Sequence, residues 1–545
     1  MNTHLQKLGQ CLSSFALTLA LAACGGGGGG GSPAPVTPSL ADLKASCVGL
    51  RGKTIEGVAV TNTVRIESAA GVNDSGMCQV LGTRAPYLDI EVTVPDNWSG
   101  RLYQQGGGGF DGRLASAITS VNGAVTAVNP VVTQRGAAYA ASNGGSRGSN
   151  PAQAAPAVWI SGTPDSQAAA TDYAYLALGT TVTFAKAVTR ALYSQNPKYT
   201  YFNGCSNGGR NAYTVAERWP TEYNGIVSGC ESMDMGGTIT GLLATAAKAA
   251  TPAEISPPQY ADAYSRAVTA CDANDGVTDG YMANPGACNF APAALQCGQP
   301  GANSNPALCL SAAQVTTLAG LLSDVKLTAG KTVYSKYNWT NFAPASTIPG
   351  VPALGVTSYG GLGGGFALLA TKNPLWLGAP PPANMPAPLL ATYNVDQAYP
   401  LISQGLLQAG ADHDKALVAR FVVNGGKLLS WHDIGDPLIS PNDHLRNFNA
   451  MTDLAKAQGL GDTRANTRLL FVPGITHGAG GGPGEIDWFG AIIDWVENAK
   501  PPEQLTYRFT LGTTVRTLPV CEAPKYARYN GTGDVNSAAS YTCTL

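Results

Sequence analysis

The sequence has little charge and almost no excess of either sign. Only 12% of its 545 residues are charged, and 33 Lys and Arg against 35 Asp and Glu give a formal net charge of −2. A nucleic-acid-binding protein normally carries a clear basic excess, so this balance argues against one. The chain also lacks a Cys-x-x-Cys pair or Cys/His cluster, which argues against a zinc site or a redox dithiol.

Long hydrophobic runs are also missing, and the apolar stretch at 15–23 is too short to span a bilayer. The stretch ends in Leu21-Ala22-Ala23, and the small residues directly before Cys24 resemble a bacterial lipoprotein signal, so residues 1–24 are predicted to be a signal peptide with a lipid attached at Cys24. An ordinary signal peptide with a chance cysteine is the alternative. Residues 25–40 are rich in Gly and Pro and predict a flexible tether. The protein is therefore expected to be exported, as an outer-membrane-anchored lipoprotein in the periplasm or at the cell surface, or as a secreted protein.

Export changes the interpretation of the cysteines, because thiols outside the cytoplasm tend to oxidise. Of twelve cysteines, an even ten remain after Cys11 and Cys24 are set aside. Eight of them form pairs that are close in sequence and predict disulfides: Cys47/Cys78, Cys271/Cys288, Cys297/Cys309 and Cys521/Cys543.

Apolar residues make up 44% of the chain, enough for a core, and strand and helix patterns alternate in two stretches. Such alternation is typical of an α/β fold with a mostly parallel sheet. Strands are expected at 87–94, 101–105, 136–142, 199–203, 225–229, 427–431 and 468–472, and helices at 170–193, 211–219, 444–455 and 485–498. The alternation breaks between 231 and 420. We therefore expect a catalytic domain formed by 41–230 and 421–545, with 231–420 as an inserted lid domain that covers the site.

The segment Gly204-Cys205-Ser206-Asn207-Gly208 fits the G-x-S-x-G pattern of a nucleophile elbow, a sharp turn between a strand and a helix that exposes the serine Oγ. The pattern is weak by itself, and Gly144-Gly145-Ser146-Arg147-Gly148 also fits it. Only Ser206 has a predicted strand before it and a predicted helix after it. Ser206 is therefore the candidate nucleophile.

A serine nucleophile needs a base, and the chain has five histidines. His477 lies in a Gly-rich loop just after a predicted strand, where it can reach a pocket, and it is the candidate general base. His413 and His444 are on polar helical faces and are expected at the surface. His432 follows a buried-looking strand, and His4 leaves with the signal.

The imidazole needs a carboxylate that orients it and stabilises its protonated form. Asp436 follows the strand predicted at 427–431, and it produces the chain order Ser206, Asp436, His477 that α/β-hydrolases use. Asp433 is the competitor. Asp before Gly or Pro commonly forms turns, so Asp436 gains its meaning from the other two residues.

Four consecutive glycines, at 106–109, follow the strand predicted at 101–105, where a hydrolase places backbone N–H groups for the oxyanion. The N–H groups of Gly109 and Asn207 are therefore the predicted oxyanion hole. The same glycines fit a dinucleotide fingerprint, but no Asp or Glu lies between Arg113 and Pro164 to bind a ribose. This argues against nucleotide binding.

Three carboxylates, Asp272, Asp275 and Asp279, fall within eight residues of a Gly-containing loop. Such oxygen ligands suit Ca²⁺, and the backbone carbonyls of Val277 and Tyr281 could complete the shell. Three like charges held by a Cys271–Cys288 bridge would repel one another without a cation. A structural calcium site is predicted, with a polar turn as the alternative.

Together these motifs resemble the tannase/feruloyl esterase family over most of the mature chain. The motifs are 204–210, the Asp272 loop, 435–440, 472–477 with 480–484, and 527–534. The resemblance implies an α/β-hydrolase core, an inserted lid that holds a calcium ion, and hydrolysis of esters of aromatic acids. By position it implies Ser206 as nucleophile, His477 as base and acid, Asp436 as its partner, and Asp272, Asp275, Val277, Asp279 and Tyr281 as calcium ligands.

One position departs from the family pattern. The family usually has a cysteine directly after the catalytic histidine, bridged to the cysteine before the serine, whereas Gly478 stands here. Cys230 is another partner for Cys205, because the strands that precede them are expected to be parallel neighbours. Such strands lie about 4.8 Å apart, close to the ~5.5 Å Cα separation of disulfides. A Cys205–Cys230 bridge is predicted, with two buried free thiols as the alternative.

The sequence thus predicts an exported serine esterase that cleaves feruloyl-, galloyl- or terephthaloyl-type esters through an acyl-enzyme on Ser206. An esterase for hydroxyalkanoate oligomers would use the same triad with a different pocket. A non-enzymatic surface or glycan-binding lipoprotein fits the tether and the low charge, but the triad argues against it. No lid cation could be assigned to bind a terephthalate-like carboxylate. Trp376, in the insertion, is a candidate for stacking on an aromatic ring, against the alternative of lid core packing.

Overall fold

The computed structural model describes residues 38–545 except 151–153, 232, 250–253, 344–355, 373–392 and 482–485. At 356–358 it describes the backbone and not the side chains. The predicted signal peptide, most of the predicted tether and Trp376 lie outside the described residues. No helix in the described part of the chain is both long and apolar enough to cross a membrane.

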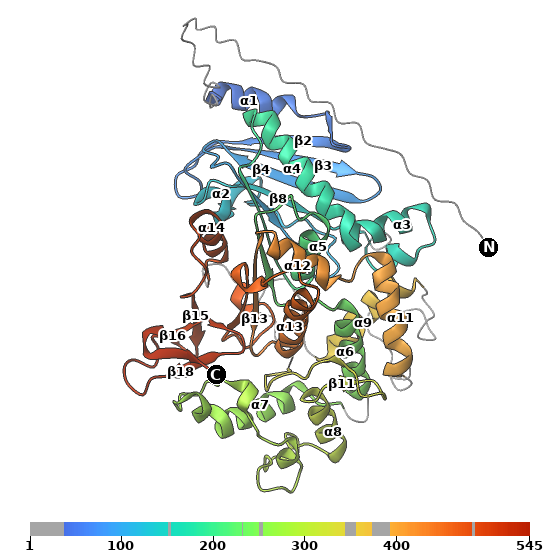
Figure 1. Cartoon of the computed structure of the whole chain (residues 1–545), viewed down its shortest axis with the longest axis vertical. Helices are drawn as coiled ribbons and strands as arrows, with labels where there is room; N and C mark the ends of the chain where they lie inside the picture. The colour runs from blue at the N-terminus through green and yellow to red at the C-terminus, as the bar shows by residue number, and fades with distance from the viewer. Residues whose placement is uncertain are drawn as a thin grey trace, which may run out of the picture. The chain divides into compact units, whose positions relative to one another are not determined.

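A mixed sheet of eleven strands organises the described residues (Figure 1). The order is β1-β2-β3-β4-β8-β5-β9-β10-β13-β14-β17, and the pairs from β8 through β14 are parallel. The strands are β1 Thr54–Ile55, β2 Val58–Ile66, β3 Met77–Arg84, β4 Leu88–Pro95, β5 Arg101–Gln105, β8 Ala138–Ser142, β9 Tyr199–Cys205, β10 Gly225–Gly229, β13 Lys427–Asp433, β14 Thr467–Val472 and β17 Cys521–Glu522.

The antiparallel strands β1 to β3 are missing from the prediction, whose first strand, at 87–94, is confirmed as β4 with bounds shifted by one residue. Antiparallel neighbours are joined by short turns, so they lack the strand-then-helix pattern that marks a parallel crossover. The parallel strands agree closely with expectation: β5 and β10 have the predicted bounds, and β9 and β13 each continue two residues further.

Side chains that alternate along the strands pack into two cores, one on each face of the sheet. Leu102, Phe202 and Ile226 lie in one core, with helices α1 (Leu40–Gly49), α4 (Ala177–Tyr193), α5 (Asn207–Arg218), α12 (Lys415–Val423) and α13 (Pro441–Ala457). Tyr103, Tyr201 and Val227 lie in the other, with α2 (Pro130–Thr133) and α14 (Trp488–Asn498). Both faces are covered, as parallel strands require.

The segment between β10 and β13 contributes no strand to the large sheet in its described part. It contains α6 (Met235–Lys248), α7 (Pro257–Cys271), α8 (Ala312–Leu321), α9 (Val356–Thr371), α11 (Val395–Ala409) and the hairpin β11 (Val325–Lys326) and β12 (Thr332–Tyr334). These elements share a core of their own, which Val158, Trp159 and Tyr173 join from the segment between β8 and β9. Helix α12, which begins at Lys415, instead packs with the sheet.

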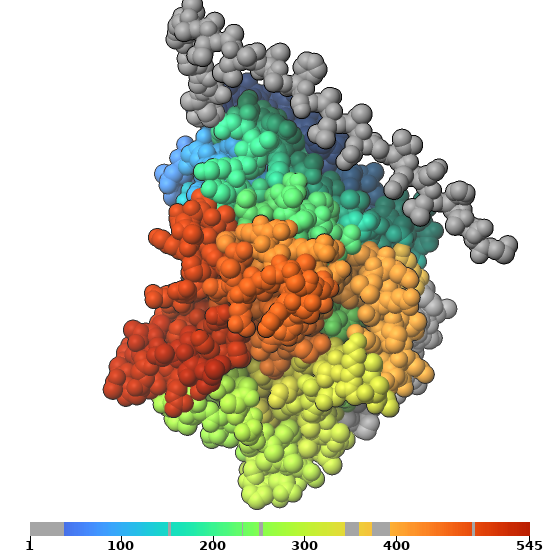
Figure 2. All heavy atoms as spheres, viewed as in Figure 1, coloured from blue at the N-terminus to red at the C-terminus, as the bar shows by residue number. Residues whose placement is uncertain are grey.

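The C-terminal residues form two hairpins, β15 (Thr506–Leu511) with β16 (Thr514–Pro519) and β18 (Tyr526–Tyr529) with β19 (Tyr541–Thr544). Their side chains pack with Tyr281 and Ala283 of the insertion. Figure 2 shows this red C-terminal segment against the light-green atoms of the insertion. The tail therefore covers the predicted calcium loop.

All five predicted cysteine pairs form disulfides in the structure: Cys47–Cys78, Cys205–Cys230, Cys271–Cys288, Cys297–Cys309 and Cys521–Cys543. The pair Cys205–Cys230 joins the ends of the parallel neighbours β9 and β10, with a Cα separation of 5.3 Å. Five disulfides fit a protein that folds in an oxidising compartment.

Candidate functional site

Ser206 occupies a strained turn between β9 and α5. Its backbone angles are φ 61° and ψ −127°, a conformation that costs free energy and that a nucleophile elbow requires. A Cβ atom on Gly204 would lie 2.5 Å from the carbonyl carbon of Gly208, so only glycine lets the helix begin this close to the strand. The Ser206 N–H donates to Gly229 O and contacts Cys230 Sγ, each at 3.0 Å.

Ser146 has none of this geometry. Its side chain is buried and its hydroxyl donates to Phe110 O at 3.4 Å. Residues 148–150, the last described ones before a gap at 151–153, form a turn and a bend rather than a helix. The second G-x-S-x-G segment therefore has a structural role and does not present its serine as a nucleophile.

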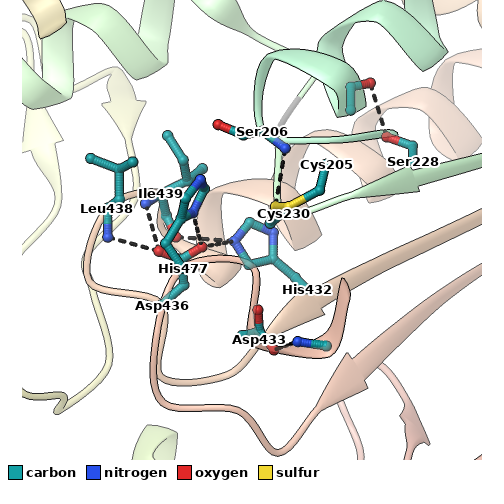
Figure 3. The surroundings of a disulfide bond; sticks show 12 residues. Cys205, Ser206, Ser228, Cys230, His432, Asp433, Asp436, Leu438, Ile439 and His477 are labelled. Carbon is teal, nitrogen blue, oxygen red and sulfur yellow. Dashed lines mark hydrogen bonds and ion pairs between the residues drawn. A yellow bond between two sulfur atoms is a disulfide. The ribbon is translucent and has the colours of Figure 1, made fainter. Parts of the chain in front are cut away.

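His477 and Asp436 form a close pair in the loops after β14 and β13 (Figure 3). His477 Nδ1 lies 2.7 Å from Asp436 Oδ2, and the N–H groups of Leu438 and Ile439 donate to Asp436 Oδ1 at 2.7 and 3.0 Å. A carboxylate accepts hydrogen bonds, so Nδ1 carries the proton and Nε2 presents its lone pair. Among the described residues, Nε2 has no hydrogen-bond partner.

The pair is strongly polarised. Burial would raise the pKa of Asp436, but the His477 charge and the hydrogen bonds from His432 and His477 hold it below its usual value. Burial would lower the pKa of His477, but the Asp436 carboxylate raises it above 6.5, with a further contribution from Glu231. The site therefore stabilises an imidazolium at His477.

The remaining histidines correct one expectation. His413 and His444 were expected at the surface, yet both are buried. His444 has hydrogen-bonding partners inside the fold, which offset the free-energy cost of burying its ring. His413 Nδ1 lies 3.6 Å from Glu217 Oε2. Asp433, the competitor of Asp436, accepts the N–H of Gly480 at 2.9 Å and so supports the histidine loop.

The glycine loop after β5 lies beside the first turn of α5. Asp111 accepts the Asn207 side-chain N–H at 2.8 Å, and the Tyr173 hydroxyl donates to Gly109 O at 2.6 Å. Burial raises the pKa of Asp111 to about 6. Asn207 is the first residue of α5, where a backbone N–H lacks an intrahelical acceptor.

A cavity of about 560 Å³ opens over these residues. Ser206, His477, Gly109 and Asn207 all line it, so the structure brings the predicted nucleophile, base and oxyanion groups to one chamber. The insertion supplies much of the apolar wall, with Met235, Leu242, Leu362 and Phe366. Among the described residues that line it there is no Lys or Arg, and Glu231 is the carboxylate.

Sequence reasoning missed Glu231 and Asp111. Glu231 is 4% exposed and follows β10 by two residues. A signal was available, because ligands of α/β sheets bind beyond the carboxyl ends of parallel strands. Asp111 had no comparable signal, since its role depends on the approach of α5.

Gly478 lies beside the disulfide next to the nucleophile. It has φ +76°, and a Cβ atom there would lie 3.1 Å from Cys205 Sγ. The Cys205–Cys230 bridge thus fills the space next to this position, and glycine suits both its crowding and its positive φ.

The loop predicted to bind calcium packs against the C-terminal hairpins, with Asp272 and Asp275 buried and several of the residues between them and Tyr281 exposed. Asp272 and Asp275 accept backbone N–H groups of Gly280 and Ala283, each at 2.8 Å, and Asp279 forms an ion pair with Arg516. Burial raises the pKa of Asp275 to about 7, and the charges of Asp279 and Asp272 add to this. No group of three or more His, Cys, Asp or Glu in the described ranges is arranged to hold a metal ion. Asp272 Oδ1, however, is buried without a hydrogen-bond partner, which fits a cation ligand.

Comparison with known proteins identifies the family. The family described as tannase and feruloyl esterase matches residues 72–359 and 399–544. The chain belongs to the tannase and feruloyl esterase family. It is therefore a carboxylic ester hydrolase with an α/β-hydrolase fold, and the homologues support aromatic carboxylic esters as its substrates.

Individual family members are distant but match over nearly the full length. Mono(2-hydroxyethyl) terephthalate hydrolase of Piscinibacter sakaiensis is 27% identical, over 93% of this chain and 91% of that protein. Feruloyl esterase B of Aspergillus niger is 23% identical, over 90% and 91%. The crystal structure of feruloyl esterase B from Aspergillus oryzae superposes with a TM-score of 0.73 at 21% identity, covering 92% of this chain and all of that one.

Proposed function

We propose that the protein is an exported serine esterase that works through an acyl-enzyme on Ser206. The observation that carries the proposal is the His477–Asp436 pair at 2.7 Å, whose Nε2 lacks a partner in the described structure while His477 and Ser206 line one cavity. His477 Nε2 takes the Ser206 hydroxyl proton as Oγ attacks the ester carbonyl, and it then returns the proton to the leaving alcohol. Water, deprotonated by the same nitrogen, attacks the acyl-enzyme and releases the acid and Ser206.

The N–H groups of Gly109 and Asn207 stabilise the oxyanion of the tetrahedral intermediates. Two anchors support this assignment: the Tyr173 hydroxyl bound to Gly109 O and the Asp111 carboxylate bound to the Asn207 side chain. The insertion acts as the lid, because its helices supply Met235, Leu242 and Phe366 to the cavity wall.

The acyl group is a neutral aromatic one of the feruloyl or galloyl type. The apolar wall and Phe366 suit an aromatic ring, whereas no Lys or Arg among the described lining residues is available to bind a second carboxylate. Glu231 would repel that carboxylate across a low-dielectric cavity. A terephthalate monoester is therefore a poorer substrate than a neutral ester of similar size.

A calcium ion held by Asp272, Asp275 and Asp279 with the carbonyls of Val277 and Tyr281 stabilises the insertion and tail. The buried, unpartnered Asp272 Oδ1 supports this proposal. The ion has a structural role, because its loop contributes none of the described residues that line the cavity. Export fits the five disulfides. Mass spectrometry of the membrane fraction tests whether Cys24 carries a lipid.

The acyl-enzyme is tested by acid-quenching the protein during turnover of an aryl ester and mapping its peptides by mass spectrometry. The expected result is an acyl adduct on the peptide that contains Ser206. The Ser146→Ala variant is expected to form the same adduct. An adduct elsewhere, or turnover retained by Ser206→Ala, would refute the mechanism. An aliphatic hydroxyalkanoate ester in the same assay tests the alternative substrate class, because faster turnover of this ester than of the aryl ester would favour a hydroxyalkanoate esterase.

The role of Glu231 is tested with a matched pair of esters, a neutral hydroxycinnamate ester and a terephthalate monoester. Glu231→Gln is expected to raise kcat/KM for the anionic ester relative to the neutral one by about tenfold, because the variant removes one like charge from the cavity wall. Glu503→Gln removes an exposed charge far along the chain and serves as the control. An unchanged ratio in Glu231→Gln would show that another feature sets the charge preference.

A further inference from the structure

A chain of buried polar side chains runs from the candidate catalytic carboxylate into the core. His432 Nε2, on β13, lies 3.0 Å from Ile439 O and 3.3 Å from Asp436 Oδ2. His432 Nδ1 lies 2.8 Å from Nδ1 of His444 on α13, and His444 Nε2 lies 2.6 Å from the Tyr213 hydroxyl on α5. Both imidazoles are fully buried.

The partners restrict where the protons of this chain lie. The Ile439 carbonyl and the Asp436 carboxylate only accept hydrogen bonds, so His432 Nε2 carries a hydrogen. The two facing Nδ1 atoms share one hydrogen, which leaves two arrangements. Either a neutral His432 accepts from His444 Nδ1–H, or His432 is a buried imidazolium and donates.

The distances favour the neutral arrangement. Charge-assisted N–H···O bonds are about 2.7–2.9 Å long, whereas His432 lies 3.3 Å from the carboxylate and is closer to a neutral carbonyl. His444 then accepts the Tyr213 hydroxyl hydrogen, and Tyr213 is 3.1 Å from Ser430 Oγ, which can donate to it. Every ring nitrogen is satisfied without a charge. Burial and the neighbouring His432 lower the pKa of His444 well below 6.5, in agreement with a neutral ring.

We propose that His432, held in its Nε2–H tautomer by His444 and Tyr213, is a positioning residue that sets the orientation of Asp436 toward His477. This inference rests on the proposed triad. His432 donates to Ile439 O, and the N–H of that same residue donates to Asp436 Oδ1. The histidine therefore holds the turn that binds one carboxylate oxygen, while its N–H also faces the other oxygen, Oδ2 (Figure 3).

The chain also connects two parts of the site that are distant in sequence. Tyr213 is on α5, the helix that begins directly after Ser206, while His432 is on the strand that leads to Asp436. A displacement of α5 would move Tyr213 and break its hydrogen bond to His444 Nε2, so that His444 would no longer be held in one tautomer. With the opposite tautomer, His432 would direct a lone pair at Ile439 O and Asp436 Oδ2, which disfavours the working position of the carboxylate.

The tautomers are read directly by two-bond ¹H–¹⁵N spectra of histidine-labelled Ser206→Ala protein. The expected result is His432 as the Nε2–H form and His444 as the Nδ1–H form. A doubly protonated His432, or a His432 with Nδ1–H, would overturn the proposal. This measurement does not depend on turnover, so its failure is distinct from a failure of the Ser206 mechanism.

Three variants test the effect on the reaction. His432→Leu is expected to lower kcat about tenfold with KM within about twofold, the scale of one lost buried hydrogen bond. His432→Gln retains an N–H donor and is expected to recover to within about threefold of the parent. Tyr213→Phe breaks the far end of the chain and is expected to act in the same direction with a smaller effect.

The pH profile separates positioning from general damage. Asp436 faces His432 and His477, and it also lies near the buried hydroxyls of Tyr337 and Tyr359. Removing the His432 donor makes the Asp436 carboxylate more basic, and a more basic carboxylate stabilises the protonated form of His477 more strongly. The pKa of His477 therefore rises, and His432→Leu is expected to move the acid limb of kcat/KM to higher pH. Tyr223→Phe removes another buried hydroxyl bond, to Gln104 at 2.6 Å, and is the control without a shift. An unshifted limb in His432→Leu, or a His432→Gln variant as slow as His432→Leu, would overturn the proposal.

Discussion

Two segments of this protein share the pattern G-x-S-x-G and differ in almost every physical respect. At Ser206 the strand ends, the backbone turns through a positive φ, and the side chain faces a cavity. At Ser146 the hydroxyl is buried against Phe110 O. The comparison shows that the pattern selects small residues for close packing, while the strand before and the helix after decide whether the serine is presented.

The two segments nevertheless meet at one side chain. Asp111 accepts the Asn207 side chain beside Ser206, and it also lies against Gly144, where an added Cβ would overlap its carboxylate. The Gly112 N–H donates to Asn143 O at 2.8 Å, and the Gly148 N–H donates to Gly112 O at 2.9 Å. The second segment therefore supports the candidate oxyanion loop.

The largest expected difference between the segments is catalytic. Ser206→Ala is expected to lower kcat by about 10⁴-fold or more, because no acyl-enzyme forms. Ser146→Ala loses one long hydrogen bond and is expected to stay within about threefold of the parent. Steady-state hydrolysis of an aryl ester measures both, and equal losses would contradict the assignment.

A smaller effect is expected when the supporting segment is crowded. Gly144 has φ +69° and lies against Asp111, so Gly144→Ala strains the backbone and displaces the carboxylate. We expect kcat to fall by about tenfold, with a lower melting temperature as well. Gly162→Ala, at φ +68° with open space around it, is the control for backbone strain alone. Equal kcat losses in the two variants would show that Gly144 does not support the oxyanion loop.

The pH dependence sharpens the comparison, because Ser206 lines the same cavity as the candidate base, His477, and Ser146 does not. The pKa of His477 is raised above 6.5 by Asp436, and the reaction needs the neutral imidazole. The value of kcat/KM is therefore expected to fall as pH is lowered through a pKa above 6.5, and to be below half of its plateau at pH 6.5. Ser146→Ala should retain this limb, whereas an acid limb centred below 6.5 would contradict the assigned pair.

The smallest effect on chemistry is expected at the calcium loop, which is outside both serine segments. Chelation is expected to lower the melting temperature by a few degrees, about 1 °C for each kcal/mol of binding free energy lost in a chain of this length. It should leave kcat nearly unchanged while the protein remains folded. Asp275→Asn is expected to abolish the response to chelation, and the exposed Asp453→Asn is expected to retain it. A melting temperature unaffected by thorough chelation would count against the ion.

Local patterns in the sequence were sufficient to predict much of the parallel part of the fold. The strand at 225–229 could be predicted because a buried strand is a short apolar run between turn residues. The pairing of Cys205 with Cys230 followed from the handedness of one crossover between neighbouring strands. The antiparallel strands β1 to β3 were missed because their order depends on pairing between segments rather than on local periodicity.

The sequence by itself determined the family, the five cysteine pairs and the candidates Ser206, Asp436 and His477, because these depend on local motifs in a characteristic order or, for Cys205 and Cys230, on the handedness of one crossover. The tertiary structure alone decided the burial of His413 and His444, the place of Glu231 in the cavity wall and the role of Asp111. A polar side chain has the same local pattern whether it faces water or a partner inside the fold. For His444, the partners Tyr213 and His432 belong to other elements, and only the packing of α5, β13 and α13 brings them within hydrogen-bonding distance.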